Sequence, residues 1–363
     1  MKTPVDVINK YLENITISAW VVDKENTIIY MNSLMKDLFG DLTGQNAALI
    51  YDSDRAETHE LAVDQPNKIE VVVLADVPFR RFRATADFGE DGLYTLELFE
   101  DVSEQRLAHK NMQKALAKIY NETKMAKTIQ NSILPINDIY WNTIAFNSMY
   151  MPADDLGGDF YDLLKLSEDE FLIYIADVSG HGIQASLLTI FMRERVRTNI
   201  DTALTGTGQL LSKLVHDFSA LGIDAAMYIT MVLCKYSKSR RELSISNAGH
   251  NCFPLIVRDN GRTETIPIKG MPVCKLADGE EYNEEIISMN PGDRLILFTD
   301  GIIEEVDNAT GLSFGSEGVR GLAEKHHAYS GSYLAQMIMD KSARYALINA
   351  KDDRSIIVAD ILS

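Results

Sequence analysis

The stretch from Asp101 to Leu134 contains neither proline nor glycine, and Pro135 follows it directly. Proline and glycine are the residues that a helix interior tolerates least, so their absence favours one continuous helix. A length of 363 residues is typical of two domains, and this helix lies between two regions that are each large enough to form a core. We therefore expect a first domain at 1–103, a helical linker at 104–134 and a second domain at 135–363.

The expected helix carries a narrow apolar stripe. Its members recur in alternating steps of four and three residues, and two more continue it after one break in phase: Met112, Leu116, Ile119, Thr123 and Ala126, then Ile129 and Ile133. Such a stripe suits either a helix packed on its own domain or a dimeric coiled coil. We favour the coiled coil, and hence a homodimer, because the segment joins two domains and is otherwise highly charged.

Charge and hydropathy exclude some classes of partner. The whole chain has a net charge of −18, of which residues 1–100, 101–134 and 135–363 carry −9, +3 and −12. Such an acidic protein is not expected to bind nucleic acid non-specifically or to rest on a membrane surface. The start of the chain has no apolar leader, and no apolar run approaches the roughly 20 residues of a membrane span. We expect a cytoplasmic protein.

The three cysteines, Cys234, Cys252 and Cys274, are widely spaced and odd in number, which is typical of a reducing compartment. Cys234 and Arg240 have the C-x5-R spacing of cysteine-dependent phosphatases. The phosphate loop of those enzymes needs small residues whose backbone amides can surround a phosphate. Here the intervening sequence is KYSKS between two strand-like runs, so a hairpin turn is the favoured interpretation.

The N-terminal region predicts five strands around short helices. Residues 15–40 have the pattern strand, turn, strand, helix, and further strand-like runs follow at 68–77, 79–88 and 92–102. With the closing sequence EDVSEQR, this arrangement resembles a PAS sensor domain over about residues 5–103. The resemblance implies a signal or an upstream partner that acts here. The sequence indicates no particular ligand, and the absence of cysteine excludes flavin–thiol photochemistry.

Aspartates mark the ends of predicted strands in the C-terminal region. The apolar run 171–176 ends at Asp177, Gly180 and Gly182 follow, and Asp159 comes directly after two glycines. A carboxylate at the mouth of a buried strand loses hydration unless a cation or several donors replace the water. Glycine lets the backbone approach something small. This stretch alone fits a metal site and a solvated turn equally well.

Two further strands repeat the pattern. The strand-like run 294–299 ends at Asp300, and Asp352 precedes a β-branched run near the end of the chain. Four such aspartates suggest convergence on one site, where like charges need cations to offset their repulsion. Oxygen ligands without histidine or cysteine indicate Mg²⁺ or Mn²⁺ rather than zinc.

Five motifs, in order over about residues 140–363, are GGDFYD, ADVSGHG, NAGHN, GDRLILFTDG and DDRS. They resemble the PPM family of metal-dependent serine/threonine phosphatases, in the bacterial, Rsb-like branch that regulates sporulation and general-stress sigma factors. The resemblance implies a C-terminal αββα sandwich of two antiparallel sheets flanked by helices, so the chain is expected to be of the α+β class. It also implies dephosphorylation of a phosphoserine or phosphothreonine protein, expected to resemble an anti-anti-sigma factor.

The family's metal ligands carry over to matching positions. By resemblance, Asp177 bridges two ions of Mn²⁺ or Mg²⁺, and the carbonyl of Val178 is also a ligand. Asp300 and Asp352 complete the shell of one ion, while Asp159 holds the other, directly or through water. The ions lower the pKa of a shared water, and the resulting hydroxide attacks phosphorus in line without a covalent enzyme intermediate. Asp177 and Asp159 are therefore the expected catalytic residues.

Other positions keep two interpretations or depart from the family. His181 either acts as general acid to the leaving oxygen or shapes the start of the following helix. His250 is expected to orient a loop beneath the site, and Asp353 to support its neighbour rather than bind metal. The chain departs from the family pattern at Cys252 and Cys274, which we expect to lie away from the aspartates.

Two rival functions remain. GGDF resembles the signature of diguanylate cyclases, but that motif follows its metal-binding strand, whereas here it precedes DVSGHG, and Phe160 replaces an acid. The other rival is a pseudo-phosphatase that only binds a phosphoprotein. It is disfavoured because all four carboxylates are present. Turnover of GTP or of p-nitrophenyl phosphate separates the three functions.

Overall fold

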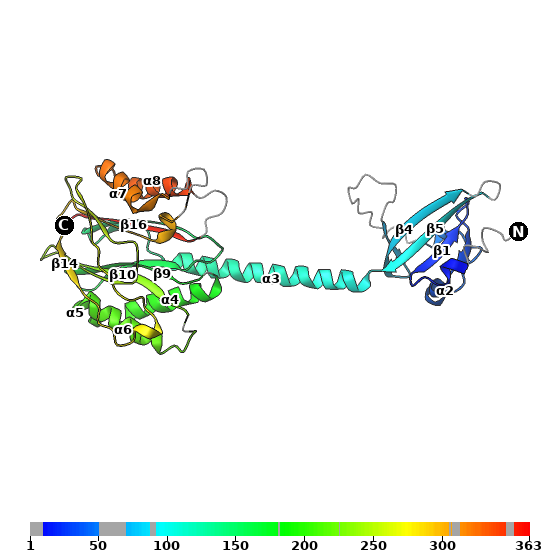
Figure 1. Ribbon diagram of the computed structural model, residues 1–363, viewed down its shortest axis with the longest axis horizontal. Coiled ribbons are helices and arrows are strands. Elements are labelled where there is room, and N and C mark those ends of the chain that lie inside the picture. The colour runs from blue at the N-terminus through cyan, green and yellow to red at the C-terminus, as the bar shows by residue number, and fades with distance from the viewer. Residues whose placement is uncertain are drawn as a thin grey trace. The chain divides into compact units, whose positions relative to one another are not determined.

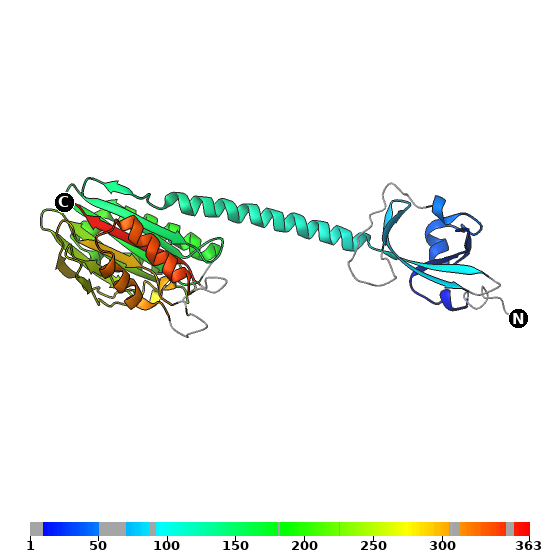
Figure 2. The same cartoon turned by 90° about the horizontal axis from the view of Figure 1, so that it is seen from above.

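The computed structural model describes residues 10–50, 70–87, 92–180, 182–224, 226–304, 306, 313–345 and 352–363. The chain divides into two compact units, Met1–Ile119 and Tyr120–Ser363. The first unit has one sheet and the second has two, as the ribbons in Figure 1 and Figure 2 show, and each unit has its own buried core. No helix within the described ranges is both long and apolar enough to cross a bilayer.

The first unit is built on one antiparallel sheet of five strands, in the order β2-β1-β5-β4-β3. Its core includes the rings of Trp20, Phe79 and Phe99, which meet edge to face. The five strands predicted here are confirmed, as is the helix that follows Asn32. The elements are β1 (Ser18–Val22), β2 (Ile28–Met31), α2 (Ser33–Phe39), η1 (Ala47–Leu49), β3 (Glu70–Leu74), β4 (Val77–Asp87) and β5 (Leu93–Asp101).

Helix α3 (Ser103–Ile133) is continuous, as the lack of proline and glycine predicted. Its apolar stripe changes character along its length. The first three members, from Met112 to Ile119, are each more than half exposed, whereas Thr123 and Ala126 are partly buried. Ile129, which follows the break in phase, is again exposed. The stripe is therefore not one uniform face, because its second half lies in the part of the helix that belongs to the second unit.

The second unit contains two antiparallel sheets. One has the order β14-β11-β10-β9-β8 and the other β13-β12-β15-β16-β7-β6. The first consists of β8 (Asp159–Lys165), β9 (Glu170–Val178), β10 (Ile229–Ser237), β11 (Glu242–Ala248) and β14 (Glu285–Ser288). The second consists of β6 (Asp138–Tyr140), β7 (Ile144–Met151), β12 (Leu255–Val257), β13 (Thr263–Thr265), β15 (Arg294–Phe298) and β16 (Arg354–Ile361).

Helices cover the outer faces of the two sheets, so the unit has four layers (Figure 1). The group on the first sheet consists of α4 (Ile183–Thr198), α5 (Ile200–Thr205), α6 (Thr207–Ser219) and η4 (Lys275–Ala277). The group on the second sheet consists of η5 (Asp300–Ile302), α7 (Gly315–Lys325) and α8 (Gly331–Ala343). Successive side chains of β9 alternate between the helix layer, at Leu172 and Tyr174, and the space between the sheets, at Ile173 and Ile175. Burial on both faces explains the continuous apolar run in β9.

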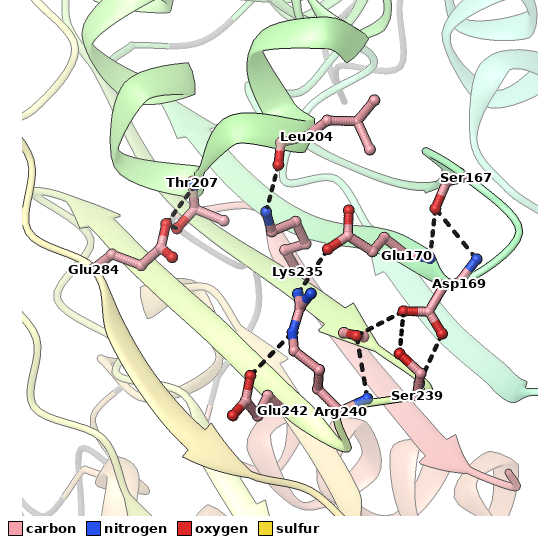
Figure 3. A network of polar contacts seen from close by, with 11 residues as sticks. Ser167, Asp169, Glu170, Leu204, Thr207, Lys235, Ser239, Arg240, Glu242 and Glu284 are labelled. Carbon is pink, nitrogen blue, oxygen red and sulfur yellow. Dashed lines mark hydrogen bonds and ion pairs between the residues drawn. The ribbon is translucent and has the colours of Figure 1, made fainter.

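The C-x5-R match lies in the hairpin between β10 and β11, as the sequence predicted. Asp169 closes the turn by accepting a hydrogen bond from the backbone N–H of Ser239 at 2.7 Å, and Arg240 pairs with Glu170 at 2.7 Å (Figure 3). Cys234 points into the core, and its burial raises the pKa of its thiol well above the usual range. A buried neutral thiol with its arginine engaged elsewhere cannot act as a phosphatase nucleophile.

Candidate functional site

Two of the predicted site aspartates face each other across neighbouring strands. β8 begins at Asp159 and β9 ends one residue after Asp177, and the antiparallel register pairs these two positions directly. Strand pairing holds this register because a slip by one residue would exchange the side chains that face the helix layer with those that face the other sheet. Two carboxylates are thereby brought to the same end of the sheet.

Asp159 is 2% exposed, and hydroxyl groups from the opposite sheet anchor it. Its Oδ2 accepts hydrogen bonds from Thr299 Oγ1 at 2.8 Å and from Ser355 Oγ at 2.7 Å. Within the described residues its Oδ1 accepts none, so one oxygen is held while the other is available. Burial, followed by the charges of Asp177 and Asp353, raises the pKa of Asp159 well above its usual range.

Asp177 lies at the centre of the acidic group. Burial of the carboxyl is the main reason that its pKa rises to about 7, and the next causes are the charges of Asp300 and Asp352. Asp353 and Glu304 contribute further. Asp300 begins η5 directly after β15, and Asp352 lies two residues before β16. The ends of strands from both sheets therefore bring the four predicted ligands together, so that their charges act on one another.

Glu304 also belongs to this acidic group, although no sequence motif singled it out. Its backbone N–H donates to the carbonyl of Asp300 at 2.8 Å, so it follows Asp300 by one helical turn. Partial burial and the charge of Asp300 raise the pKa of Glu304. Asp352 is largely open to solvent, yet partial burial of its carboxyl and the charge of Asp300 raise its pKa as well. The signal in the sequence was the acidic pair four residues after Asp300.

Asp353 has a different role from the four predicted ligands. It is 6% exposed, and its carboxylate accepts hydrogen bonds from the backbone N–H groups of Ala153 at 2.8 Å, of Gly158, and of Asp159 at 3.4 Å. Its own N–H donates to Asp352 Oδ1 at 2.8 Å. Asp353 thus supports its neighbour, as predicted, and it also holds the loop that precedes β8.

The carbonyl of Val178 lies against the glycine before Asp159. A Cβ added to Gly158 would lie 2.6 Å from Val178 O and 3.3 Å from Gly180 O, so only glycine allows this approach. The N–H of Val178 donates to the carbonyl of Gly158 at 3.2 Å. Gly180 has a φ of 88°, a left-handed conformation that favours glycine. The two predicted glycine-rich segments therefore pack directly on each other.

His250 bridges β10 and β15 beside two of the predicted ligands, Asp177 and Asp300. Its Nδ1 lies 3.0 Å from Thr230 Oγ1, and its Nε2 lies 2.9 Å from the carbonyl oxygen of Phe298. A carbonyl can only accept, so Nε2 carries the proton and Nδ1 accepts from the hydroxyl. Thr230 pairs with Asp177 in the sheet, and burial lowers the pKa of His250. These contacts support the structural interpretation of His250. His181 lies outside the described residues.

The expectation that both cysteine departures lie away from the aspartates is wrong for Cys252. Its side chain is 1% exposed and packs in the core with Phe298 and Ile302, directly below η5. Burial raises the pKa of this thiol, and so do the charges of Asp300 and Asp159. The error arose because distance along the chain was taken for distance in space. Cys274 packs against the core beneath α4 and α6.

The chemistry of the donor set fits hard divalent cations. Carboxylate oxygens and one backbone carbonyl are the ligands that Mg²⁺ and Mn²⁺ prefer. Within the described ranges, no group of three or more Asp, Glu, His or Cys side chains forms a closed ion site. Burial is the main cause of the raised pKa values of Asp159 and Asp177, and neighbouring carboxylates add to it, so a bound cation would offset the same unfavourable charge.

Comparison with known proteins finds a matching family model and related sequences. The model of the stage II sporulation protein E (SpoIIE) family matches residues 167–362. Phosphoserine phosphatase RsbU of Bacillus subtilis (strain 168) is 23% identical over 253 residues, which are 69% of this chain and 73% of RsbU. Phosphoserine phosphatase RsbP of the same strain is 25% identical over 185 residues. That match covers 50% of this chain and 45% of RsbP, so the chain spans less than half the length of RsbP.

Solved structures share the fold of the second unit. The SiaA-PP2C domain of Pseudomonas aeruginosa aligns with a TM-score of 0.59 at 22% identity, over 69% of this chain and 99% of that domain. The RsbU and RsbW domains of Rv1364c from Mycobacterium tuberculosis align with a TM-score of 0.51 at 20% identity, over 61% of this chain and 60% of that protein. At these identities the similarity shows that the PP2C-type fold of stacked antiparallel sheets and outer helices is shared.

Proposed function

Because this chain belongs to the stage II sporulation protein E (SpoIIE) family, we propose that it is a metal-dependent phosphatase for phosphoserine or phosphothreonine in a protein. The observation that carries the proposal is the pairing of Asp159 with Asp177 at one end of the sheet, within the field of Asp300 and Asp352. Two relatives that bear the name phosphoserine phosphatase, RsbU and RsbP, support the reaction class.

In the proposed site Asp177 would be shared by two ions, with the carbonyl of Val178 as a further ligand. Asp300 and Asp352 would hold one ion, and Asp159 would hold the other. Bound Mn²⁺ or Mg²⁺ would supply a hydroxide at neutral pH and positive charge for the phosphoryl oxygens. Thr299 and Ser355 hold one oxygen of Asp159 and so keep its other oxygen directed at the cation.

In the described part of the chain, the protein's own residues position these ligands, and neither of two buried cysteines is available as a nucleophile. Cys234 is buried in the core with a raised pKa, and Cys252 is buried beneath the aspartates with a raised pKa. A neutral buried thiol does not attack phosphorus. Direct attack by water, without a covalent enzyme intermediate, therefore fits the residues that surround the site.

Chelation is the direct test of this function. We expect the purified chain to hydrolyse p-nitrophenyl phosphate and a phosphoserine peptide with Mn²⁺, to lose that activity in EDTA, and to regain it when Mn²⁺ is added back. Full activity after exhaustive chelation would contradict the proposal. Binding of a phosphoprotein with no turnover would favour a pseudo-phosphatase, and Mn²⁺-dependent consumption of GTP would favour a diguanylate cyclase.

For the whole chain we propose a cytoplasmic signalling enzyme with three parts. Residues 1–103 would be a PAS-type sensor, 104–134 the linker and 135–363 the phosphatase. A five-stranded antiparallel sheet with a short helix supports the first assignment. The proposed substrate is a phosphorylated protein resembling an anti-anti-sigma factor, and a signal or partner would act on the sensor. A net charge of −18 disfavours nucleic acid as a partner.

We propose that the exposed part of the linker pairs two copies of the chain. Leu116 and Ile119 are more than half exposed on α3, which leaves an apolar face for a second helix. Changing both to glutamate should weaken the homodimer and alter phosphatase activity, because charges would face each other across the seam. Light scattering and turnover on the double variant test this. A variant that stays dimeric with unchanged turnover would leave the linker as a spacer.

A further inference from the structure

The last turns of helix α3 are docked on the second unit, and one polar side chain is the centre of that contact. Gln130 is 3% exposed and is the buried residue of α3, whereas Thr123, Ala126 and Lys127 on the same side of the helix are partly buried. Burying an amide without hydrogen bonds is unfavourable, so the partners of Gln130 should reveal why it is there.

Both hydrogen bonds of Gln130 go to the backbone of a single residue, Gly157. Nε2 donates to the carbonyl oxygen of Gly157 at 2.7 Å, and the N–H of Gly157 donates to Oε1 at 3.4 Å. The amide group therefore pairs with this residue as a neighbouring strand would. Only glycine fits at position 157, because a Cβ there would collide with Tyr150 Oη and the carboxylate of Asp353.

Gly157 lies two residues before Asp159, and the hydrogen bonds are continuous between them. The next N–H groups, those of Gly158 and Asp159, donate to the carboxylate of Asp353. Thr299 and Ser355 then hold the side chain of Asp159. The turn is thus fixed from the helix on one side and from the second sheet on the other.

We propose that Gln130 is a positioning residue that holds the turn 157–159, so that helix α3 sets how well Asp159 can bind a cation opposite Asp177. That the ligand of Asp159 is a metal ion rests on the proposed function. Each residue along a helix advances 1.5 Å and turns by about 100°, so even a small slide or rotation of α3 would draw the Gln130 amide away from Gly157. The turn would then lose its contact with the helix, and the side chain of Asp159 would no longer be held in one direction.

Replacement of Gln130 by methionine tests this, because the side chains have similar length and only the two hydrogen bonds are lost. Asn131→Met is the matched control, since Asn131 is the next residue of the same helix and is exposed. Mn²⁺ binding is measured without substrate, by the electron paramagnetic resonance signal of free Mn²⁺, and p-nitrophenyl phosphate turnover is measured against Mn²⁺ concentration. Partners that orient metal ligands typically change metal affinity about 10- to 100-fold, so Gln130→Met should weaken Mn²⁺ binding about tenfold.

The expected pattern separates positioning from general stability. Turnover at saturating Mn²⁺ should recover to within a few-fold of the wild type, while the Mn²⁺ concentration for half activity rises in parallel with the binding constant. Unchanged Mn²⁺ affinity in a folded Gln130→Met, or the same change in Asn131→Met, would overturn the proposal. If Gln130→Met does not fold, Gln130→Glu decides, because it keeps the shape but loses the Nε2 donor. A wild-type chain that bound no Mn²⁺ would instead contradict the proposed function itself.

Discussion

Replacing Asp177 with asparagine is expected to abolish nearly all turnover while the chain stays folded. Asp177 is paired with Asp159 across the sheet, and its carboxylate also feels Asp300 and Asp352. An amide of the same shape carries no negative charge and cannot bridge two cations. Even partners that only orient a metal ligand typically cost 10- to 100-fold, so loss of the bridging carboxylate should exceed about 100-fold.

The same substitution should stabilise the protein in EDTA, increasingly so as the pH rises. The pKa of Asp177 is raised in the folded chain to about 7, above the ordinary 3.8 of an unfolded aspartate. Between these values the folded state holds a proton that the unfolded state releases, so the free energy of unfolding of the metal-free wild type falls as pH rises. Asp177→Asn has no such group. Urea unfolding at pH 5 and pH 8 measures the difference.

Substitution of other aspartates checks that the loss of turnover is specific to the proposed bridging role of Asp177. Asp300→Asn should lose turnover to a similar extent. Asp353→Asn should be milder, because Asp353 accepts hydrogen bonds from Ala153 and Gly158 and an asparagine keeps one of those acceptors. If Asp177→Asn kept the wild-type kcat at saturating Mn²⁺, the proposed site would be misplaced.

Local patterns in the sequence were enough to predict most strands and the acidic strand ends. Residues 171–176 are apolar on both faces because β9 lies between a helix layer and a second sheet, and that environment leaves a continuous run in the sequence. Asp177 then appears as an abrupt change at the end of the run. The same contrast marked Asp300 and Asp352. These features depend on neighbours along the chain, which is why a single sequence reveals them.

Contacts between distant segments could not be predicted in the same way. Ser355 and Asp159 are 196 residues apart, and a serine in a β-branched strand gives no sign that its hydroxyl meets a carboxylate of another sheet. Nothing in the sequence distinguishes Gln130 from the other polar residues of a charged helix, yet it is buried against Gly157. Cys252 was placed wrongly for the same reason. Hydrogen-bond partners are determined by how the sheets stack, and one sequence contains no direct record of that.

The linker shows how one pattern can combine two environments. A regular spacing from Met112 to Ala126 suggested one continuous seam. In the structure the first three members are exposed, whereas Thr123 and Ala126 are partly buried. Spacing along a helix identifies which residues share a face, but not what covers that face. Packing on its own domain therefore applies to the second part of the helix, whereas pairing with a second copy stays a prediction for the first part.

Gly158→Ala should be almost as damaging as Asp177→Asn, although it adds only a methyl group and removes no charge. The new Cβ would lie 2.6 Å from the carbonyl oxygen of Val178, which is closer than real Cβ contacts allow. Both groups belong to the backbone, so one strand end must shift, and the shift separates Asp159 from Asp177. Misplacement by about 1 Å can cost about 100-fold in rate, and we expect a loss of that size with weaker Mn²⁺ binding.

Gly321→Ala is the control for this experiment, because it makes the same chemical change in the opposite context. Gly321 is exposed in α7, and a Cβ there would meet nothing within 4 Å. Alanine is preferred to glycine inside a helix by roughly 0.5–1 kcal/mol, so this variant should be slightly more stable and fully active. Turnover, Mn²⁺ binding and urea unfolding of both variants measure the contrast. Wild-type activity in Gly158→Ala would mean that the close packing of the two glycine-rich segments does not hold the aspartates together, and the geometry proposed for the site would fall with it.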